Sequence, residues 1–367
     1  MRFSVGDWDI VMKGSRPQGI SVEISTRCNL SCIHCFRLSS PAIPYGDMDY
    51  SDFRAVVDNA VESGVRRVVL TGWGEPTLNP YLLDMLSYAK SRGLEVALNT
   101  NGTKLYELAD SLIRLGVDEL YVSVDAVDVE LYGRIRGRGD LPAVSRGIAR
   151  VGELKRGLCR RAPSVKVLLT VTKLNVGQVP LVVDYAAGLE VEEVYLSYFI
   201  PHSGASEYLD CYSDSECVAM FRQAVGEALS RVARYPGLHF KLWVPGAGGY
   251  SQRSCPYVDR RALHVRVDGR VSPCLFMAYS WETRIEGVRR RVRGYTIGNA
   301  LRERLSGIWG RNGELYFKHF FRLMPTCLDC DLRTYCSYSA DTEYDCWGNS
   351  PNCSHCPYYY KLSYCPL

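Results

Sequence analysis

The sequence lacks any apolar run long enough to span a bilayer, and its first residues, Met1 to Gly14, lack the apolar core of a signal peptide. It also lacks a strong charge of either sign, since 44 Lys and Arg oppose 40 Asp and Glu to give a formal charge of +4. A charge this small permits an anionic partner but does not call for nucleic acid. We therefore expect a cytoplasmic protein that has neither a membrane nor a nucleic acid as its partner.

Cysteine, in contrast, is abundant, with 15 residues in a chain of 367. In a reducing compartment so many cysteines favour metal binding over disulfides. Three lie near the N-terminus and nine lie from Cys255 onward, which predicts two metal regions. The remaining three, Cys159, Cys211 and Cys217, have no partner spacing, and we expect them to be packed thiols.

Short β-branched runs alternate with amphipathic segments of helical period between residues 20 and 199. The expected strands are residues 20–25, 67–71, 95–99, 119–124, 165–171 and 193–198. The expected helices are residues 51–63, with Ser51 as N-cap, and residues 81–92, 104–115, 141–154, 179–187 and 215–234. Six βα units with nearly continuous apolar strands predict an α/β fold, a partial (β/α)6 TIM-like barrel. An open doubly wound sheet would give a similar pattern.

Three divisions of the chain follow from composition. Residues 1–16 form an N-terminal segment, and residues 17–245 form the partial barrel with a following helix. A glycine-rich linker at residues 246–249 precedes residues 250–367, where cysteine, proline and tyrosine are dense and periodicity fades. That composition is typical of a small, cysteine-rich domain held together by metal.

The first metal motif is C-x3-C-x2-C, formed by Cys28, Cys32 and Cys35 directly after the first strand. Three thiolates on one loop can hold three irons of a cubane cluster and leave the fourth without a protein ligand. In barrel folds chemistry gathers at the C-terminal ends of strands, which is where this loop lies. The alternative is a structural zinc knuckle or a set of core thiols.

With this strand, loop and spacing, the region resembles the radical S-adenosylmethionine (SAM) superfamily. The resemblance implies that the three cysteines bind a [4Fe–4S] cluster whose open iron is chelated by SAM. It also implies that reduction cleaves SAM to a 5′-deoxyadenosyl radical that abstracts hydrogen from a substrate. Where the family often has an aromatic residue before the third cysteine, this chain has His34, and Phe36 follows the motif as a further cofactor contact.

Further segments match the family in the expected order. The segment Thr71-Gly72-Trp73-Gly74-Glu75-Pro76 is similar to the GGEP motif, in which backbone groups bind the SAM amino group, with Trp73 in place of one glycine. The resemblance assigns the remaining SAM contacts to Gly74, Glu75, Asn101, Ser123, Asp125 and Arg136. The alternatives are an ordinary glycine–proline turn, helix caps at the serine and aspartate, and a solvated arginine.

The C-terminal cysteines resemble the SPASM extension of this superfamily, which houses one or two auxiliary [4Fe–4S] clusters. The expected ligands are Cys255, Cys274, Cys327, Cys330, Cys336, Cys346, Cys353, Cys356 and Cys365. We expect Cys255, Cys274 and Cys346 on the nearer cluster. The farther cluster then takes Cys327, Cys330, Cys336 and one of the last three cysteines. Zinc is the alternative, because CxxC pairs are also zinc ligands.

The resemblance implies a radical SAM oxidoreductase or maturase acting on a peptide, protein or small-molecule substrate, with an electron donor such as ferredoxin or flavodoxin. Residues 345–353 resemble archaeal members linked to maturation of tungsten-containing oxidoreductases, although porphyrin-modifying members carry similar tails. A non-catalytic iron–sulfur carrier or scaffold is the alternative class. A carrier needs four protein ligands for each cluster, whereas the first motif supplies three.

Overall fold

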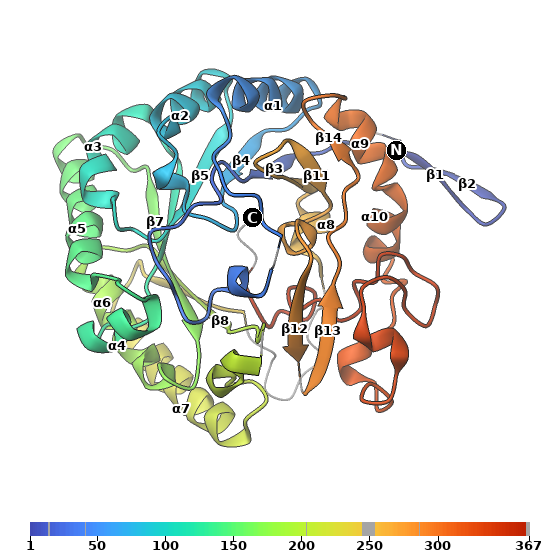
Figure 1. Ribbon diagram of the computed structural model, residues 1–367. Helices are drawn as coiled ribbons and strands as arrows, with labels where there is room; N and C mark the ends of the chain where they lie inside the picture. Colours follow the sequence, from blue (N-terminus) through green and yellow to red (C-terminus); the bar gives the residue numbers. More distant parts are fainter. Residues whose placement is uncertain (14, 41, 203, 244–253, 286, 365–367) are drawn as a thin grey trace.

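The computed structural model describes residues 1–367 except 14, 41, 203, 244–253, 286 and 365–367. Six neighbouring parallel strands form the centre of its main sheet and curve into a partial barrel (Figure 1). They are β3 (Gly19–Val22), β4 (Arg67–Leu70), β5 (Glu95–Thr100), β6 (Glu119–Ser123), β7 (Ser164–Val171) and β8 (Glu193–Tyr198). All six expected strands are therefore confirmed in place and order. Their near-continuous burial follows from the packing of both faces of a parallel sheet.

Helices cover the outer side of the strands in an arc. They are α1 (Tyr50–Glu62), α2 (Leu82–Ser91), α3 (Leu105–Leu115), α4 (Val129–Arg136), α5 (Leu141–Gly157), α6 (Val179–Gly188) and α7 (Ser215–Val232). The expected helices are present, but the N-cap of α1 is Asp49, so Ser51 lies inside the first turn. Helix α4 was not expected. Its N-cap is Asp128, whose side chain accepts a hydrogen bond from the Leu131 N–H.

Four further strands extend the sheet at its edges. Strand β9 (His239–Trp243) pairs in parallel with β8, and β10 (Ala262–Val265) pairs in parallel with β3. Strands β11 (Arg270–Ser272) and β14 (Gly298–Asn299) continue antiparallel beyond β10, giving ten strands. The cysteine-rich region thus shares backbone hydrogen bonds with the barrel. A buried contact of 2.8 Å between Ser21 Oγ and His264 Nδ1 joins the side chains at that junction.

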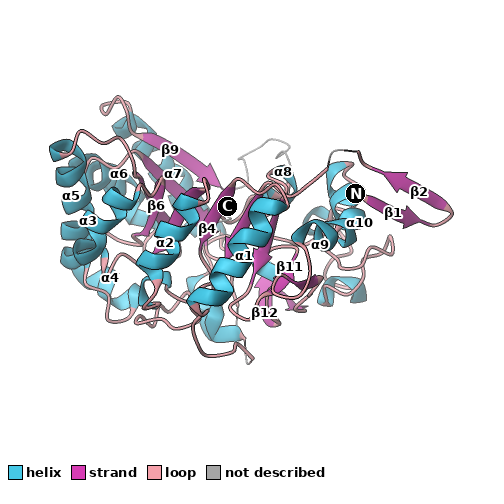
Figure 2. Ribbon diagram, turned by 90° about the horizontal axis from the view of Figure 1, so that it is seen from above, coloured by secondary structure: helices cyan, strands magenta, loops and turns pink. Residues whose placement is uncertain are grey.

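The remaining elements lie beside the barrel in the views of Figures 1 and 2. They are the hairpin β1 (Arg2–Val5) and β2 (Trp8–Val11), the short helix α8 (Pro256–Asp259), the hairpin β12 (Trp281–Ile285) and β13 (Val288–Val292), and helices α9 (Leu305–Arg311) and α10 (Gly313–Phe320). The C-terminal tail then returns to the barrel, where the Leu362 carbonyl accepts a hydrogen bond from the Tyr198 N–H at 2.8 Å. The expected linker at 246–249 and Cys365 lie outside the described residues.

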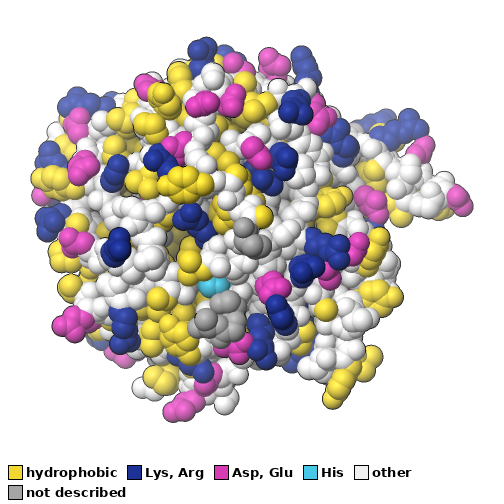
Figure 3. Space-filling view, in the orientation of Figure 1, with side chains coloured by type: hydrophobic (Ala, Val, Ile, Leu, Met, Phe, Trp, Pro, Cys, Tyr) yellow, Lys and Arg dark blue, Asp and Glu magenta, His cyan; other side chains and the backbone are white. Residues whose placement is uncertain are grey.

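The surface carries charged side chains of both signs, as the small net charge of the sequence predicts. Basic and acidic side chains are interspersed over the face shown in Figure 3. Among the described residues, the helices contain no stretch both long and apolar enough to cross a membrane.

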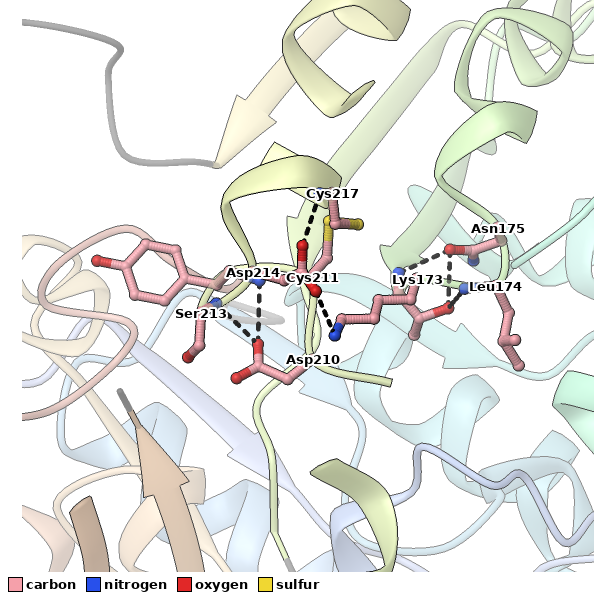
Figure 4. The surroundings of a disulfide bond; sticks show 10 residues. Lys173, Leu174, Asn175, Asp210, Cys211, Ser213, Asp214 and Cys217 are labelled. Carbon is pink, nitrogen blue, oxygen red and sulfur yellow. Dashed lines mark hydrogen bonds and ion pairs between the residues drawn. A yellow bond between two sulfur atoms is a disulfide. The ribbon is translucent and has the colours of Figure 1, made fainter. Parts of the chain in front are cut away.

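Two of the scattered cysteines differ from expectation. Cys211 and Cys217 form a disulfide, with Cα atoms 5.2 Å apart, so they are not packed thiols (Figure 4). The reason is local: the cap of α7 folds the chain back, because Asp214 accepts from the Cys217 N–H at 2.9 Å. That turn brings together two cysteines whose separation of six residues matches no familiar motif. The third, Cys159, is a free, exposed thiol.

Candidate metal and cofactor sites

The first cysteine motif lies in the loop between β3 and α1, at the C-terminal end of the sheet. The loop is held by backbone hydrogen bonds to the end of α4, from the Ile33 N–H to the Ile135 carbonyl at 3.0 Å and from the Ser31 N–H to the Gly137 carbonyl. Within the loop, the Cys35 N–H donates to the Cys32 carbonyl at 3.1 Å. The unexpected helix α4 therefore serves as the support of the cysteine loop.

All three thiols line one cavity of about 250 Å³ at the mouth of the barrel. Seven of the eight predicted SAM contacts line the same cavity: His34, Phe36, Gly74, Glu75, Asn101, Ser123 and Arg136. The eighth, Asp125, lies behind Arg136. The structure thus brings the predicted residues together, because the parallel strands that carry them end at one edge of the sheet.

The Thr71–Pro76 segment packs closely on the cysteine loop. The Glu75 N–H donates to the Arg27 carbonyl at 2.7 Å, and a Cβ atom on Gly74 would lie 2.4 Å from the Ser25 carbonyl oxygen. Glycine is required at 74 by this backbone approach. The Glu75 N–H therefore already donates to a backbone carbonyl and is not available to a ligand.

The Glu75 carboxylate is buried and likewise accepts its hydrogen bonds from the protein. One oxygen accepts from the Thr100 hydroxyl at 2.6 Å and from the Thr77 hydroxyl at 2.7 Å, and the other accepts from the Asn101 N–H at 2.7 Å. Glu75 therefore ties the loop after β4 to the end of β5. Its contribution to the cavity is to position Asn101, whose amide donates to Asn29 at 2.8 Å.

A buried ion pair lies behind the cysteine loop. Arg136 Nη1 donates to Asp125 Oδ2 at 2.7 Å, and the Thr170 N–H donates to the other oxygen at 2.8 Å. Burial opposes ionisation of Asp125, but the attraction of His34 and Arg136 and the Thr170 hydrogen bond outweigh it and hold its pKa below the ordinary value. Arg136 is therefore not a solvated surface residue. Its Nε has no hydrogen-bond partner within the described part of the chain, so one guanidinium N–H can still donate to a ligand.

His34 points to the same aspartate, with Nε2 3.3 Å from Asp125 Oδ2. Burial lowers the pKa of His34, against the attraction of the Asp125 carboxylate. Its Nδ1 has no partner among the described residues. The imidazole thus offers one polar atom and one ring edge at the cavity.

The donor set fits an iron–sulfur cluster and SAM. Burial raises the pKa of the Cys32 thiol to about 12 and also raises the pKa of Cys35. Without a cation these thiols stay protonated, so metal binding releases their protons and supplies the missing positive charge. The partly unpartnered Arg136 guanidinium supplies a matching charge for a carboxylate.

The C-terminal cysteines of the described chain fall into two groups of four. The Cys356 thiol acts electrostatically on Cys255, Cys274 and Cys353, and burial raises the pKa of Cys255 to about 12 and of Cys356 to about 11. Cys346 is exposed and interacts with Cys336, Cys330 and Cys327. This grouping favours a different division from the one expected from sequence, with Cys346 in the second group and Cys353 in the first.

A turn held by Asp345 explains the position of Cys346. The buried Asp345 carboxylate accepts from the Asn349 side chain at 2.6 Å and from the Ser354 hydroxyl at 2.9 Å. This clamp folds residues 345–354 back on themselves.

In the described residues, no three His, Cys, Asp or Glu side chains lie close enough to hold a single metal ion. A cubane needs wider spacing than one ion does, because each thiolate binds a different iron.

Several cavity residues were missed by sequence reasoning. They are Thr170, Tyr195, Ser197, Tyr198, Phe199, Ile200, Leu275, Ser363 and Tyr364. Ser197, a polar residue in an apolar strand, and the Tyr358–Tyr360 run were the available signals. The tail segment gave no local sign that it would enter the barrel.

Comparisons with known proteins agree with this geometry. The profile of the radical SAM superfamily matches residues 22–165, and that of the SPASM iron–sulfur cluster-binding domain matches residues 255–331. The chain is 30% identical over 350 residues to the tungsten-containing aldehyde ferredoxin oxidoreductase cofactor-modifying protein of Pyrococcus furiosus, covering 94% of this chain and 96% of that one. It is 28% identical over 192 residues to the AdoMet-dependent heme synthase of Methanosarcina barkeri, about half of each chain.

Two solved structures share the fold. Streptococcus suis SuiB bound to S-adenosylmethionine aligns with a TM-score of 0.65 at 18% identity, covering 88% of this chain and 73% of that one. Native anSMEcpe with bound AdoMet aligns with a TM-score of 0.64 at 16% identity, covering 94% and 96%.

This chain belongs to the radical SAM superfamily and carries a SPASM-type iron–sulfur domain. Its cofactors are accordingly a [4Fe–4S] cluster with SAM in the barrel and auxiliary iron–sulfur clusters in the C-terminal region.

Proposed function

We propose that this protein is a radical SAM oxidoreductase that modifies a cofactor, in the manner of a maturase. The observation that carries the proposal is the cavity at the barrel mouth, where three clustered thiols, a buried Arg136–Asp125 pair and the loop after β4 converge. The P. furiosus relative, named as a cofactor-modifying protein, matches nearly the whole chain and so supports the maturase assignment.

The residues divide the work of such a site. Cys28, Cys32 and Cys35 are the proposed ligands of the cluster, and Arg136 is placed to hold the SAM carboxylate. When bound, the cluster and SAM supply a carbon radical that removes a hydrogen atom from the substrate. Trp73 and Phe199, each 3% exposed, give this cavity apolar walls, which limit the access of water to the reacting region.

The C-terminal cysteines provide eight described thiols for two fully ligated auxiliary clusters. We propose Cys255, Cys274, Cys353 and Cys356 for the inner cluster. For the outer cluster we propose Cys327, Cys330, Cys336 and Cys346. The two groups of four are the support for this division, which leaves Cys365, outside the described residues, without an iron to bind.

A direct experiment is to reduce the reconstituted protein anaerobically in the presence of SAM and measure 5′-deoxyadenosine. We expect release of 5′-deoxyadenosine and methionine. Intact clusters without either product, under a strong reductant, would instead support the electron-carrier alternative.

The substrate class is tested by adding candidates to that assay. The cofactor of a tungsten-containing aldehyde ferredoxin oxidoreductase, a peptide and a porphyrin are each incubated with the reduced protein and SAM. We expect that cofactor to raise 5′-deoxyadenosine formation above the uncoupled level. Stimulation by the peptide or porphyrin alone would contradict the cofactor-maturase assignment while leaving the radical SAM chemistry intact.

A further inference from the structure

Trp73 occupies a position where the matching family motif has glycine. Its ring points away from the Thr71–Pro76 segment and contacts the C-terminal region. Its indole Nε1–H donates to the Leu275 carbonyl at 3.3 Å, and Leu275 directly follows Cys274. On the other side, its ring meets the ring of Phe36 edge-on, with centroids 4.4 Å apart, and Phe36 directly follows Cys35. One side chain therefore touches the neighbours of a cysteine from each of two cluster sites.

The backbone around Trp73 is fixed by a buried carboxylate. Glu23, which follows β3, accepts from the Trp73 N–H at 2.7 Å through one oxygen, and the Tyr279 hydroxyl donates to the other. A Cβ atom on Gly72 would lie 2.5 Å from Glu23 Cγ, so the glycine allows the carboxylate to reach the loop. Tyr279 also packs edge-on against the indole, with centroids 5.3 Å apart. The Trp73 ring is held in one orientation from both ends.

The rings around Trp73 form one dry cluster between the two sites. Trp73 is 3% exposed and Trp281 is 2% exposed, and the cluster of buried apolar residues that contains them also contacts Phe36, Cys274 and Cys356. A second, longer path through the same cluster runs from Phe36 to Trp281, with ring centroids 5.8 Å apart, and from the Trp281 indole N–H to the Phe276 carbonyl at 3.0 Å, one residue farther from Cys274. Packing alone explains a buried aromatic cluster. It does not require the Trp73 indole N–H to meet the carbonyl of the residue that directly follows Cys274.

We propose that Trp73 is the electronic link between the barrel cluster and the inner auxiliary cluster. The route from Cys35 to Cys274 follows the covalent chain from Cys35 to Phe36, crosses one ring contact to Trp73, passes through one hydrogen bond to Leu275 and follows the covalent chain back to Cys274. Electron tunnelling weakens steeply across gaps and less through bonded contacts, so this route is favoured over the path through Trp281. One electron leaves the reduced auxiliary cluster and one electron arrives at the oxidised barrel cluster. No bond forms or breaks, and no proton moves.

The proposal rests on the cluster assignments of the proposed function and not on SAM cleavage or on any substrate. Its test is a redox measurement, so loss of 5′-deoxyadenosine formation and loss of electron exchange can be told apart. Oxidised, reconstituted holoprotein is mixed with one equivalent of titanium(III) citrate. Samples frozen at increasing times are examined by electron paramagnetic resonance, and the two cluster signals are followed to their equilibrium ratio. Iron content and both midpoint potentials are measured alongside.

The variants separate the link from general packing. We expect Trp73→Leu to slow the exchange by roughly tenfold or more, equivalent to about 1.4 kcal/mol in the barrier, at unchanged iron content and potentials. Trp73→Phe keeps a ring but loses the hydrogen bond to Leu275, so its exchange rate should lie between those of the unmodified protein and Trp73→Leu. If Trp73→Leu fails to load iron, the rate of Trp73→Phe decides the question. Trp281→Leu, from the same cluster, and Trp309→Phe, a buried indole that donates to Ser15 at 3.2 Å, should exchange as the unmodified protein does. Equal slowing in Trp73→Leu and Trp281→Leu, or a wild-type rate in both Trp73 variants, overturns the proposal.

Discussion

Arg136 and Asp125 form an ion pair at 2.7 Å in which the two side chains are only 6% and 1% exposed. A buried pair of this kind contributes little net stability while intact, but removal of one partner leaves an uncompensated charge. The pair holds the end of α4 against β6, and the backbone at that end supports the cysteine loop. The ion pair therefore affects both folding and the cofactor cavity.

The two roles of this pair can be separated by substitution. We expect Arg136→Gln to lower the free energy of unfolding by about 3–5 kcal/mol, because Asp125 is left charged and unpaired. The double variant Asp125→Asn with Arg136→Gln should recover most of that loss. SAM affinity, measured by calorimetry on reconstituted protein, should stay weakened by roughly tenfold or more in the double variant, since a charge-assisted hydrogen bond is lost. Unchanged SAM affinity in the double variant contradicts a role for Arg136 in binding.

Removal of one barrel thiol should affect one cluster only. Cys32→Ala is expected to lose about four of about twelve irons, because the C-terminal thiols form separate groups. It should also lose 5′-deoxyadenosine formation. Iron quantification and Mössbauer spectroscopy check the first result. Cys159→Ala, which removes an exposed free thiol, is the control and should keep all iron. Retention of the full iron content in Cys32→Ala would refute the ligand assignment.

Glu75 should be needed for stability even without cofactors. Its carboxylate accepts from four donors, so Glu75→Gln turns one accepting atom into a donor that faces other donors. We expect a loss of about 1–3 kcal/mol in the apoprotein, measured by denaturant unfolding. Glu95→Gln, an exposed carboxyl on β5 paired with Arg67, is the matched control and should cost less than about 1 kcal/mol. An equal loss in the two variants would argue against the buried network.

His264 should make folding stability depend on pH. Burial and the nearby Arg266 lower its pKa to about 3 from an ordinary 6.5, so the folded protein binds fewer protons than the unfolded chain between those values. Stability is therefore fully present above pH 6.5 and falls as the pH is lowered toward 3, by roughly 1.4 kcal/mol for each pH unit from this group.

Denaturant unfolding of the apoprotein across that range measures the slope. His264→Phe should reduce the slope by about one proton, whatever its effect on absolute stability. The other buried histidines keep their own contributions in both proteins, so the difference isolates His264. An identical slope in the variant is the outcome that excludes this assignment.

The Cys211–Cys217 disulfide should stabilise the start of α7. The loop that it closes is short, so its removal by the double variant Cys211→Ser with Cys217→Ser should cost about 2 kcal/mol. Thermal unfolding with and without reductant measures this cost. Reductant should lower the melting temperature of the unmodified protein and leave that of the variant unchanged. A thiol count on the denatured, unreduced apoprotein provides an independent check.

Much of the site could be predicted from sequence because its residues follow strands. Cys28, Asn101 and Ser123 each lie at or just beyond the C-terminal end of a strand, and parallel strands bring such ends to one edge. Periodicity alone located those strands. The sequence pattern was therefore sufficient to predict which residues of the barrel meet at this edge of the sheet.

The remainder depends on contacts that no local pattern encodes. Trp73 and Leu275 are 202 residues apart, and the tail residue Tyr364 packs on Tyr195 with centroids 4.7 Å apart. The grouping of Cys346 depends on the turn held by Asp345. Periodicity reports which side of an element is buried, and not which distant segment covers it.

The pairing of β10 with β3 has a consequence for the order of biosynthesis. Strand β3 carries the cysteine loop, yet one of its two neighbours in the sheet, Ala262–Val265, is synthesised more than 240 residues later. Contacts of such long sequence separation form slowly, because a large loop must close before they stabilise the chain. The barrel edge beside the first cluster site is thus completed only after most of the chain has left the ribosome. The inner auxiliary site also needs Cys353 and Cys356, so it can form only later, once the C-terminal end of the chain has been made.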